Sequence, residues 1–144
     1  MRKLRDIMTK DIQYVTPQDN VYEAAVLMKD YNIGSVPIMD SDRLIGVLTD
    51  RDIAVRCTAS KKPGSTQVTD VMSRNVITGH PDMSVDEASK LMASYQIRRL
   101  PVVEQGRLVG YVALGDLAVH NDHRDEASDA LSEISESYPP TFEI

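Results

Sequence analysis

The chain repeats itself. Residues 6–56 align with residues 70–120 at a constant offset of 64 positions and without a gap, and 17 of the 51 aligned pairs are identical. Unrelated sequences of average composition would match at only about one position in fifteen to twenty. The identities are therefore the result of a duplication, and the two copies are expected to fold alike.

Each copy contains a predicted helix with start and stop signals. In the first copy Asn20 and Glu23 form a capping-box pattern, in which groups three residues apart satisfy one another at a helix start. Apolar residues then recur at helical spacing. Asn32 and Gly34 follow, and both residue types are typical of a helix end. The second copy repeats the capping pattern at the equivalent positions.

A β-hairpin follows the helix in each copy. In the first, residues 36–39 and 44–48 are short apolar runs on either side of a polar turn. Pro37 lies in the first run, which places that strand at a sheet edge or at a strand start. A strand near residues 12–16 and a second helix that begins near Asp50 complete the order β-α-β-β-α.

One copy of about 50 residues has too little core to cover both helices and the sheet, whereas two copies can cover each other's exposed faces. We therefore expect an α+β protein with two βαββα repeats. Residues 1–60 would form the first repeat, residues 61–69 a linker, and residues 70–121 the second repeat. Residues 122–144 would form an acidic tail.

The net charge of −6 lies in that tail. Residues 122–144 carry seven acidic residues and one basic residue, which leaves 15 residues of each sign in residues 1–121. Nucleic-acid binding needs clustered positive charge, so we expect no nucleic-acid partner. A metabolite with phosphates needs only a few placed cations and is compatible with a neutral body.

The sequence also favours the cytoplasm. No stretch approaches the ~18 apolar residues that a membrane-spanning helix needs, and the basic N-terminus is not followed by the apolar region of a signal peptide. Cys57 is the one cysteine, so it can form no internal disulfide. We expect a cytoplasmic protein without membrane association.

The segment from Gly46 to Asp52 is the first candidate for ligand binding. It is a buried strand that runs directly into a helix start, where free N–H groups attract anions. The Thr49 hydroxyl can bond to a phosphate, and Asp52 can accept both hydroxyl protons of a ribose, as acids do in dinucleotide folds. Gly46 leaves room for a ring to lie near the backbone.

The same residues allow a plainer interpretation. Thr-x-x-Asp is close to a capping box, and acids are favoured in any first helical turn. In the second copy Ala113 stands in place of the threonine and cannot cap, yet Asp116 is retained. This favours a role for the acid beyond one half of a capping box, although its interaction with the helix dipole stays open as an alternative.

Arg98 and Arg99 are the second candidate. They occur in one copy only, because Gly34 and Ser35 stand at the equivalent positions of the other. The forked donors of arginine suit phosphate oxygens, and at a helix-to-strand turn neighbouring side chains need not point to opposite faces. The alternative is a pair of solvated surface side chains.

Metal binding and catalysis have weaker support. His120, Asp122, His123 and Asp125 are metal-ligating residue types, but their spacing fits no strong zinc pattern, and a fraying helix end explains them as well. Cys57 has no histidine near it in sequence that could activate it as a nucleophile. No Walker-type glycine loop is present. We therefore expect no bound metal, no cofactor and no enzymatic activity.

An ordered set of short motifs occurs twice. It consists of Asp6-Ile7-Met8-Thr9 and Asp70-Val71-Met72-Ser73 at the start of the copies, the strands with Pro37 and Pro101, and the Gly46, Thr49 and Asp52 segment. The set resembles the cystathionine β-synthase (CBS) domain, and the resemblance covers residues 4–120. Two such domains in tandem form a CBS pair, or Bateman module. The resemblance implies two repeats packed about a pseudo-two-fold axis, with two related clefts.

In such pairs the clefts commonly bind AMP, ADP, ATP or S-adenosylmethionine, and the resemblance implies a ligand of this kind here. It also implies that each cleft combines the Thr/Ser-x-x-Asp segment of one repeat with the turn before the proline strand of the other. In the first cleft Thr49 and Asp52 would then face Arg98 and Arg99.

In the second cleft Asp116 would face Gly34 and Ser35, without the hydroxyl that is usual at the start of the motif. Val76 and Ile77 would lie against the base in the first cleft. The first cleft therefore has the hydroxyl, the carboxylate and two cations, and it is expected to bind phosphorylated ligands more tightly than the second.

CBS pairs often regulate a fused enzyme, channel or transporter, and no such domain is evident in this sequence. The implied role is a stand-alone regulatory module that acts on a protein not identified by the sequence. The resemblance also implies a homodimer, and two-fold association is the commonest way to cover apolar helix faces. The alternative is a protein-interaction or structural module whose ligand clefts are vestigial.

Overall fold

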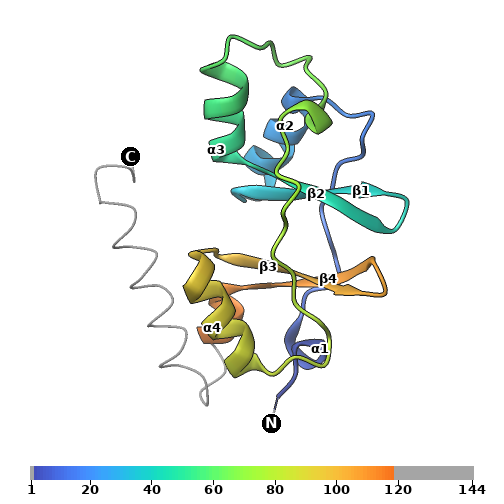
Figure 1. Ribbon diagram of the computed structural model, residues 1–144, viewed down its shortest axis with the longest axis vertical. Coiled ribbons are helices and arrows are strands. Elements are labelled where there is room, and N and C mark those ends of the chain that lie inside the picture. Colours follow the sequence, from blue (N-terminus) through green and yellow to red (C-terminus); the bar gives the residue numbers. More distant parts are fainter. Residues whose placement is uncertain (1, 119–144) are drawn as a thin grey trace. The chain divides into compact units, whose positions relative to one another are not determined.

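The computed structural model describes residues 2–118 and has the expected α+β architecture (Figure 1). The acidic tail and the group of His120, Asp122, His123 and Asp125 lie outside the described residues. The elements are, in chain order, α1 (Leu4–Ile7), α2 (Val21–Tyr31), β1 (Ser35–Asp40), β2 (Arg43–Thr49), α3 (Asp50–Asp52), a π-helical segment (Ile53–Thr58), a 3-10 turn (Val68–Asp70), α4 (Val85–Tyr95), β3 (Arg99–Glu104), β4 (Arg107–Ala113) and α5 (Leu114–Ala118).

The two long helices, α2 and α4, begin as predicted. The Asn20 side chain accepts the backbone N–H of Glu23 at 2.8 Å, and Ser84 caps α4 in the same way. Helix α2 ends at Asn32, whose φ of 52° is left-handed, as its sequence indicates. Helix α4 ends on a left-handed residue too, Gln96, with φ of 55°. Both helices therefore end at a left-handed residue, although only the first copy has asparagine at that position.

Strands β1 and β2 form the predicted antiparallel hairpin, with Pro37 opposite Val47. Val47 exchanges both of its backbone hydrogen bonds with Ser73, at 2.9 and 3.0 Å, so it needs no N–H from β1. The Pro37 carbonyl accepts the N–H of Val15 at 3.1 Å on the other side of β1. Proline is tolerated because its position requires only an acceptor.

The strand predicted near residues 12–16 is reduced to one parallel bridge between Val15 and Ile38. Pro17 follows two residues after Val15 and has no N–H with which to continue a ladder. The second copy makes an equivalent single bridge at Gly79. The first β element of each repeat is therefore a one-residue contact.

The described residues form two compact units. Unit 1 consists of residues 2–10, 77–104 and 109–118, and unit 2 consists of residues 11–76 and 105–108. Each unit is built mainly from one sequence repeat, but it includes the segment that opens the other repeat.

The opening segments are attached to their units by equivalent backbone bridges. In unit 1 Thr9 exchanges two hydrogen bonds with Tyr111 of β4, at 2.8 and 2.9 Å. In unit 2 Ser73 makes the same exchange with Val47 of β2. Thr9 and Ser73 are equivalent positions of the duplication, so both units are completed in the same way.

Each unit has its own apolar core, formed by the inner faces of its helices and strands. The core of unit 1 contains Leu4, Val85, Ala88, Met92, Leu100, Val102, Val112, Leu114 and Leu117. The core of unit 2 contains Val15, Val21, Ala24, Met28, Val36, Ile38, Leu48, Cys57, Val68, Val71 and Met72. Cys57 is thus a packed core residue, 2% exposed.

In the second strand of each hairpin, a glycine packs against a methionine of the opening segment that belongs to the same unit. A Cβ atom on Gly46 would lie 2.6 Å from Met72 Sδ, and one on Gly110 would lie 2.9 Å from Met8 Sδ. The space over Gly46 is therefore filled by a thioether, and the expectation that it admits a ligand ring is wrong. The repeated glycines and methionines are explained by this contact.

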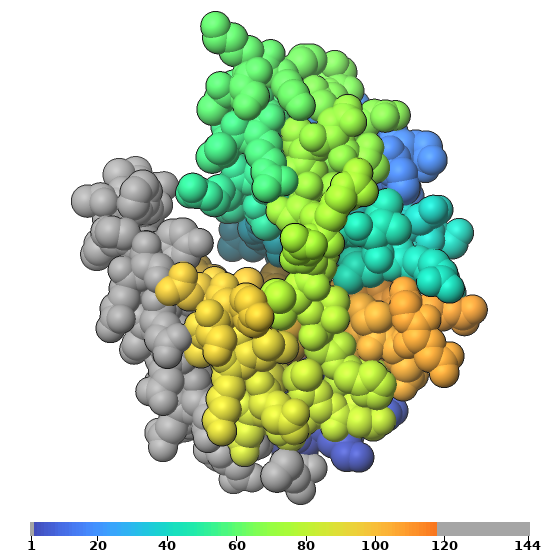
Figure 2. All heavy atoms as spheres, viewed as in Figure 1, coloured from blue at the N-terminus to red at the C-terminus, as the bar shows by residue number. Residues whose placement is uncertain are grey.

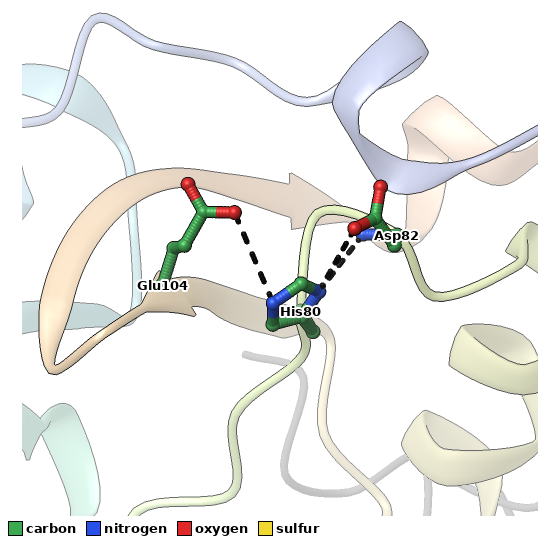
Figure 3. Close-up of side chains that lie close together, drawn as sticks. All are labelled: His80, Asp82 and Glu104. Carbon is green, nitrogen blue, oxygen red and sulfur yellow. Dashed lines mark hydrogen bonds and ion pairs between the residues drawn. The ribbon is translucent and has the colours of Figure 1, made fainter.

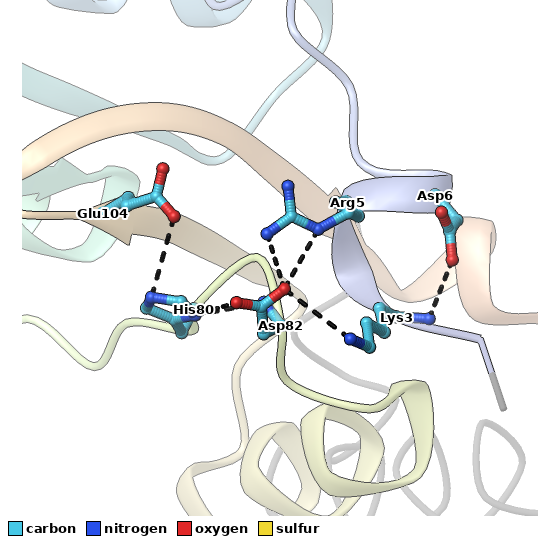
Figure 4. A network of polar contacts seen from close by, with 6 residues as sticks. All are labelled: Lys3, Arg5, Asp6, His80, Asp82 and Glu104. Atoms are coloured by element: carbon cyan, nitrogen blue, oxygen red, sulfur yellow. Dashed lines mark hydrogen bonds and ion pairs between the residues drawn. The ribbon is translucent and has the colours of Figure 1, made fainter.

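A polar network fixes the N-terminal segment to unit 1 (Figure 4). The Arg5 guanidinium donates to Asp82 Oδ1, with Nε at 3.1 Å, and the Lys3 ammonium lies 3.8 Å from the same oxygen. His80 lies between Asp82 and Glu104. The hydrogen bond from Arg5 lowers the pKa of Asp82, and Asp82 raises the pKa of Arg5.

The segment between the repeats lies at the surface. Residues 58–65, green in Figure 2, are all exposed. Within the described part of the chain, no helix is both long and apolar enough to cross a membrane.

The glycine–methionine contact predicts a specific sensitivity to a single methyl group. Gly46→Ala and Gly110→Ala place a Cβ within 3.0 Å of a backbone carbonyl as well as of the methionine sulfur. We expect each to lower the free energy of unfolding by about 1–3 kcal/mol, the usual cost of overpacking, as measured by urea denaturation. Gly115→Ala is the matched control, because its Cβ would meet nothing within 4 Å. Equal behaviour of all three variants would contradict this account.

The Arg5–Asp82 pair predicts a pH-dependent attachment of the N-terminal segment. Because the folded-state pKa of Asp82 is depressed, its contribution is present at neutral pH and is lost as the pH falls below its ordinary value of 3.8. Asp82→Asn should accelerate hydrogen exchange at the Leu4 and Arg5 amides at neutral pH, and added salt should reduce the difference. Asp40→Asn, an exposed change in unit 2, should leave both amides unaffected. A difference that persists unchanged in acid would disprove the role of the carboxylate.

Candidate functional site

Thr49 and Asp52 form a complete capping box at the start of α3. The Asp52 N–H donates to Thr49 Oγ1 at 3.0 Å, and the Thr49 N–H donates to Asp52 Oδ2 at 3.0 Å. The plainer interpretation of this motif is therefore confirmed as a structural role. It leaves the Thr49 hydroxyl proton available, because the cap uses only a lone pair of the oxygen.

The Asp52 carboxylate has two further partners that the sequence did not indicate. The Ser73 hydroxyl donates to it at 3.2 Å, and Arg56 Nε lies 3.7 Å from its other oxygen. Arg56 also donates to the Met72 carbonyl at 3.1 Å. Asp52 is only 7% exposed, so a hydroxyl and a cation stabilise its charge where water cannot.

Asp116 retains one half of the box in unit 1. Its Oδ2 accepts the N–H of Ala113 at 2.9 Å, although Ala113 has no hydroxyl to return. This half of the box needs only a backbone N–H, so a structural role explains why Asp116 is retained without the hydroxyl. A role for this acid in ligand binding stays a prediction. The two acids share a structural task at the strand-to-helix junction.

Each strand-to-helix junction is also bonded to the turn before the proline strand of the same repeat. In unit 2 the Asp50 N–H donates to the Gly34 carbonyl at 2.9 Å, and Ser35 lies opposite Thr49 in the hairpin. In unit 1 the Leu114 N–H donates to the Arg98 carbonyl at 2.8 Å. Each unit thus gathers its own turn and its own helix start.

The candidate residues consequently fall into two groups. Gly34, Ser35, Thr49, Asp52 and Val76 belong to unit 2, and Arg98, Arg99, Ile77 and Asp116 belong to unit 1. The composite first cleft combines residues of both groups and stays a prediction. The same holds for the contact of the base with Val76, which is half-buried, and Ile77, which packs against the core of unit 1.

The two arginines are held differently. Arg98 is exposed, and Arg99, the first residue of β3, is half-buried. The Arg99 guanidinium carbon lies 3.9 Å from the centre of the Tyr111 ring. Sequence reasoning did not single out Tyr111, because a tyrosine in a predicted strand is usually explained by packing.

One group of metal-ligating side chains occurs in the described residues and was not predicted (Figure 3). Ligand atoms of His80, Asp82 and Glu104 lie within 4.8 Å of one another. The Asp82 backbone N–H donates to His80 Nδ1 at 3.0 Å, and the Asp82 carboxylate is already engaged by Arg5. A cation would have to compete with that guanidinium, so the group is explained by the attachment of the N-terminal segment.

Comparisons with known proteins identify the repeat. The CBS domain family matches residues 4–57 and again residues 68–120. Two Bacillus subtilis (strain 168) proteins, YlbB and the CBS domain-containing protein YhcV, are each 49% identical to this chain, over 138 and 135 residues. Each alignment covers 94% of this chain, and they cover 93% and 96% of the relatives.

Solved structures agree with the sequence relatives. The CBS domain pair of protein MJ0100, in complex with 5′-methylthioadenosine and S-adenosyl-L-methionine, is 32% identical to this chain with a TM-score of 0.74. The similarity covers 86% of this chain and 98% of that chain. The duplication, the two βαββα-like units and these matches lead to one conclusion: the chain belongs to the CBS domain family and is a tandem CBS domain pair.

Proposed function

We propose that this CBS pair is a regulatory module that binds an adenosine-containing ligand, namely AMP, ADP, ATP or S-adenosylmethionine. The observation that carries the proposal is the similarity to the CBS pair of MJ0100, whose complex contains two molecules that share the adenosine group. The module would act non-catalytically in the cytoplasm. It would bind a partner protein in one of its two states, ligand-bound or ligand-free, and not in the other.

The residues at the helix starts suit the parts of such a ligand. A nearly buried carboxylate such as Asp52 can accept ribose hydroxyls as it accepts the Ser73 hydroxyl now. The free proton of the Thr49 hydroxyl can be donated to a phosphate oxygen. Arg98 and Arg99 supply the cations that a phosphate chain needs.

Two pairings of acid and arginine are compatible with this chemistry. The family resemblance pairs Asp52 with Arg98 and Arg99. The hydrogen bond between Leu114 and Arg98 supports a pairing of Asp116 with these arginines inside unit 1. We propose the second pairing, because Asp116 lies two residues after the bonded Leu114 on the same short helix.

Calorimetric titration tests both the function and the pairing. ATP and adenosine would be titrated into the unmodified protein and into Asp52→Ala, Asp116→Ala and Arg99→Ala. A charge-assisted hydrogen bond contributes about 1.5–3 kcal/mol, so loss of one should weaken ATP binding about tenfold or more. We expect Asp116→Ala and Arg99→Ala to weaken the same binding event.

The other outcomes are equally informative. If Asp52→Ala and Arg99→Ala weaken the same event instead, the pairing between repeats is correct. If the unmodified protein gives neither heat nor a thermal shift with ATP, AMP or S-adenosylmethionine, the clefts are vestigial, and the chain acts as an interaction module.

We also propose that the module is a homodimer. The family resemblance implies a dimer, and closed two-fold association is the commonest form of homo-oligomer. Tyr22 and Tyr31 on α2 and Tyr95 on α4 are between 54% and 66% exposed and are available to such a contact. Light scattering at micromolar protein should give about twice the chain mass of 16.0 kDa. A mass equal to one chain over the whole concentration range would refute the dimer.

A further inference from the structure

Arg99 is stacked on an aromatic ring. Its guanidinium carbon lies 3.9 Å from the centre of the Tyr111 ring, well inside the ~6 Å over which a cation and a ring face attract one another. Both side chains are half-buried, so solvent screens the contact less than it would at an open surface. The stack occupies one face of the planar guanidinium and leaves the N–H groups at its edge free to donate.

The duplication provides an internal comparison for this pair. In the first copy Ser35 stands at the position of Arg99, and Val47 stands at the position of Tyr111. Valine is sufficient for this strand position in unit 2, so the fold itself does not demand an aromatic ring there. The ring occurs in the copy that carries the arginine.

The ring is mounted on a rigid part of unit 1. The Tyr111 backbone exchanges two hydrogen bonds with Thr9, at 2.8 and 2.9 Å, and the preceding Gly110 is packed against Met8. Arg99 begins the neighbouring strand of the same hairpin. A long side chain that is otherwise free to sample many rotamers is thereby held in one place, which lowers the ordering cost of binding an anion.

We propose that Tyr111 is a positioning residue that holds the Arg99 guanidinium ready for a ligand phosphate, and so gives unit 1 its preference for phosphorylated adenosine ligands. This inference rests on the proposed function. Tyr111 itself acts through Arg99, so its removal reduces affinity for the phosphate chain and not for the nucleoside.

The test compares ATP with adenosine by calorimetry in Tyr111→Val, Tyr111→Phe and the unmodified protein. Tyr111→Val introduces the residue of the other copy and should weaken ATP about threefold to tenfold, the range of a cation–π contact at a partly buried site. Adenosine affinity should not change. Tyr111→Phe retains the ring and should bind ATP normally. Val47→Ala, the matched change in the copy without the arginine, should leave the ATP-to-adenosine ratio unaltered.

A double substitution tests whether Tyr111 acts on ATP affinity through Arg99. In an Arg99→Ser background, Tyr111→Val should cause no further loss of ATP affinity, because residues that act as a unit are non-additive. Tyr111→Leu serves as a second ring-free variant if Tyr111→Val does not fold. Equal losses for ATP and adenosine, or full ATP affinity without the ring, would overturn the positioning role alone. Absence of ATP binding in the unmodified protein would overturn the proposed function and this inference with it.

Discussion

The contact between a methionine sulfur and a bare glycine is the constraint on which both units depend. In each unit the methionine arrives on a segment distant in sequence, and the adjacent residue of that segment completes a backbone bridge to the same hairpin. A Cβ at either glycine would separate the segment from the strand. The contact leaves no space for a methyl group. Met8 and Met72 can therefore pack their segments against the hairpins only where the strand carries a glycine.

The acids at the two strand-to-helix junctions have a structural role that is compatible with the proposed ligand binding. Asp52 and Asp116 are first of all structural acids, because each accepts the N–H of the residue that ends its strand. A carboxylate held in this way cannot rotate freely, and a fixed carboxylate recognises paired hydroxyls better than a mobile one. Structural capping and the proposed ligand recognition are compatible here, because the cap determines where the carboxylate points.

Local features of the fold could be predicted from the sequence, and contacts between distant segments could not. The duplication, the caps of α2 and α4, the hairpins and the helix start at Asp50 follow from patterns within a few residues. The partners of Asp52 did not follow, because Ser73 lies 21 residues away and Arg56 appeared only as a residue of a predicted helix. The stack of Arg99 on Tyr111 was missed for the same reason, since no local pattern states which strand neighbours face each other.

Each unit includes the segment that opens the other repeat, and this arrangement has a consequence for how a repeat can fold. In the arrangement of this structure, the opening segment of a repeat packs on the hairpin of the other repeat and not on its own. A single repeat could reproduce this arrangement only with a second molecule, and the fraction of completed units would then vary with concentration. Linking two copies in one chain makes that encounter intramolecular, at an effective concentration set by the connecting segment. The duplication thus turns an assembly reaction into a folding reaction.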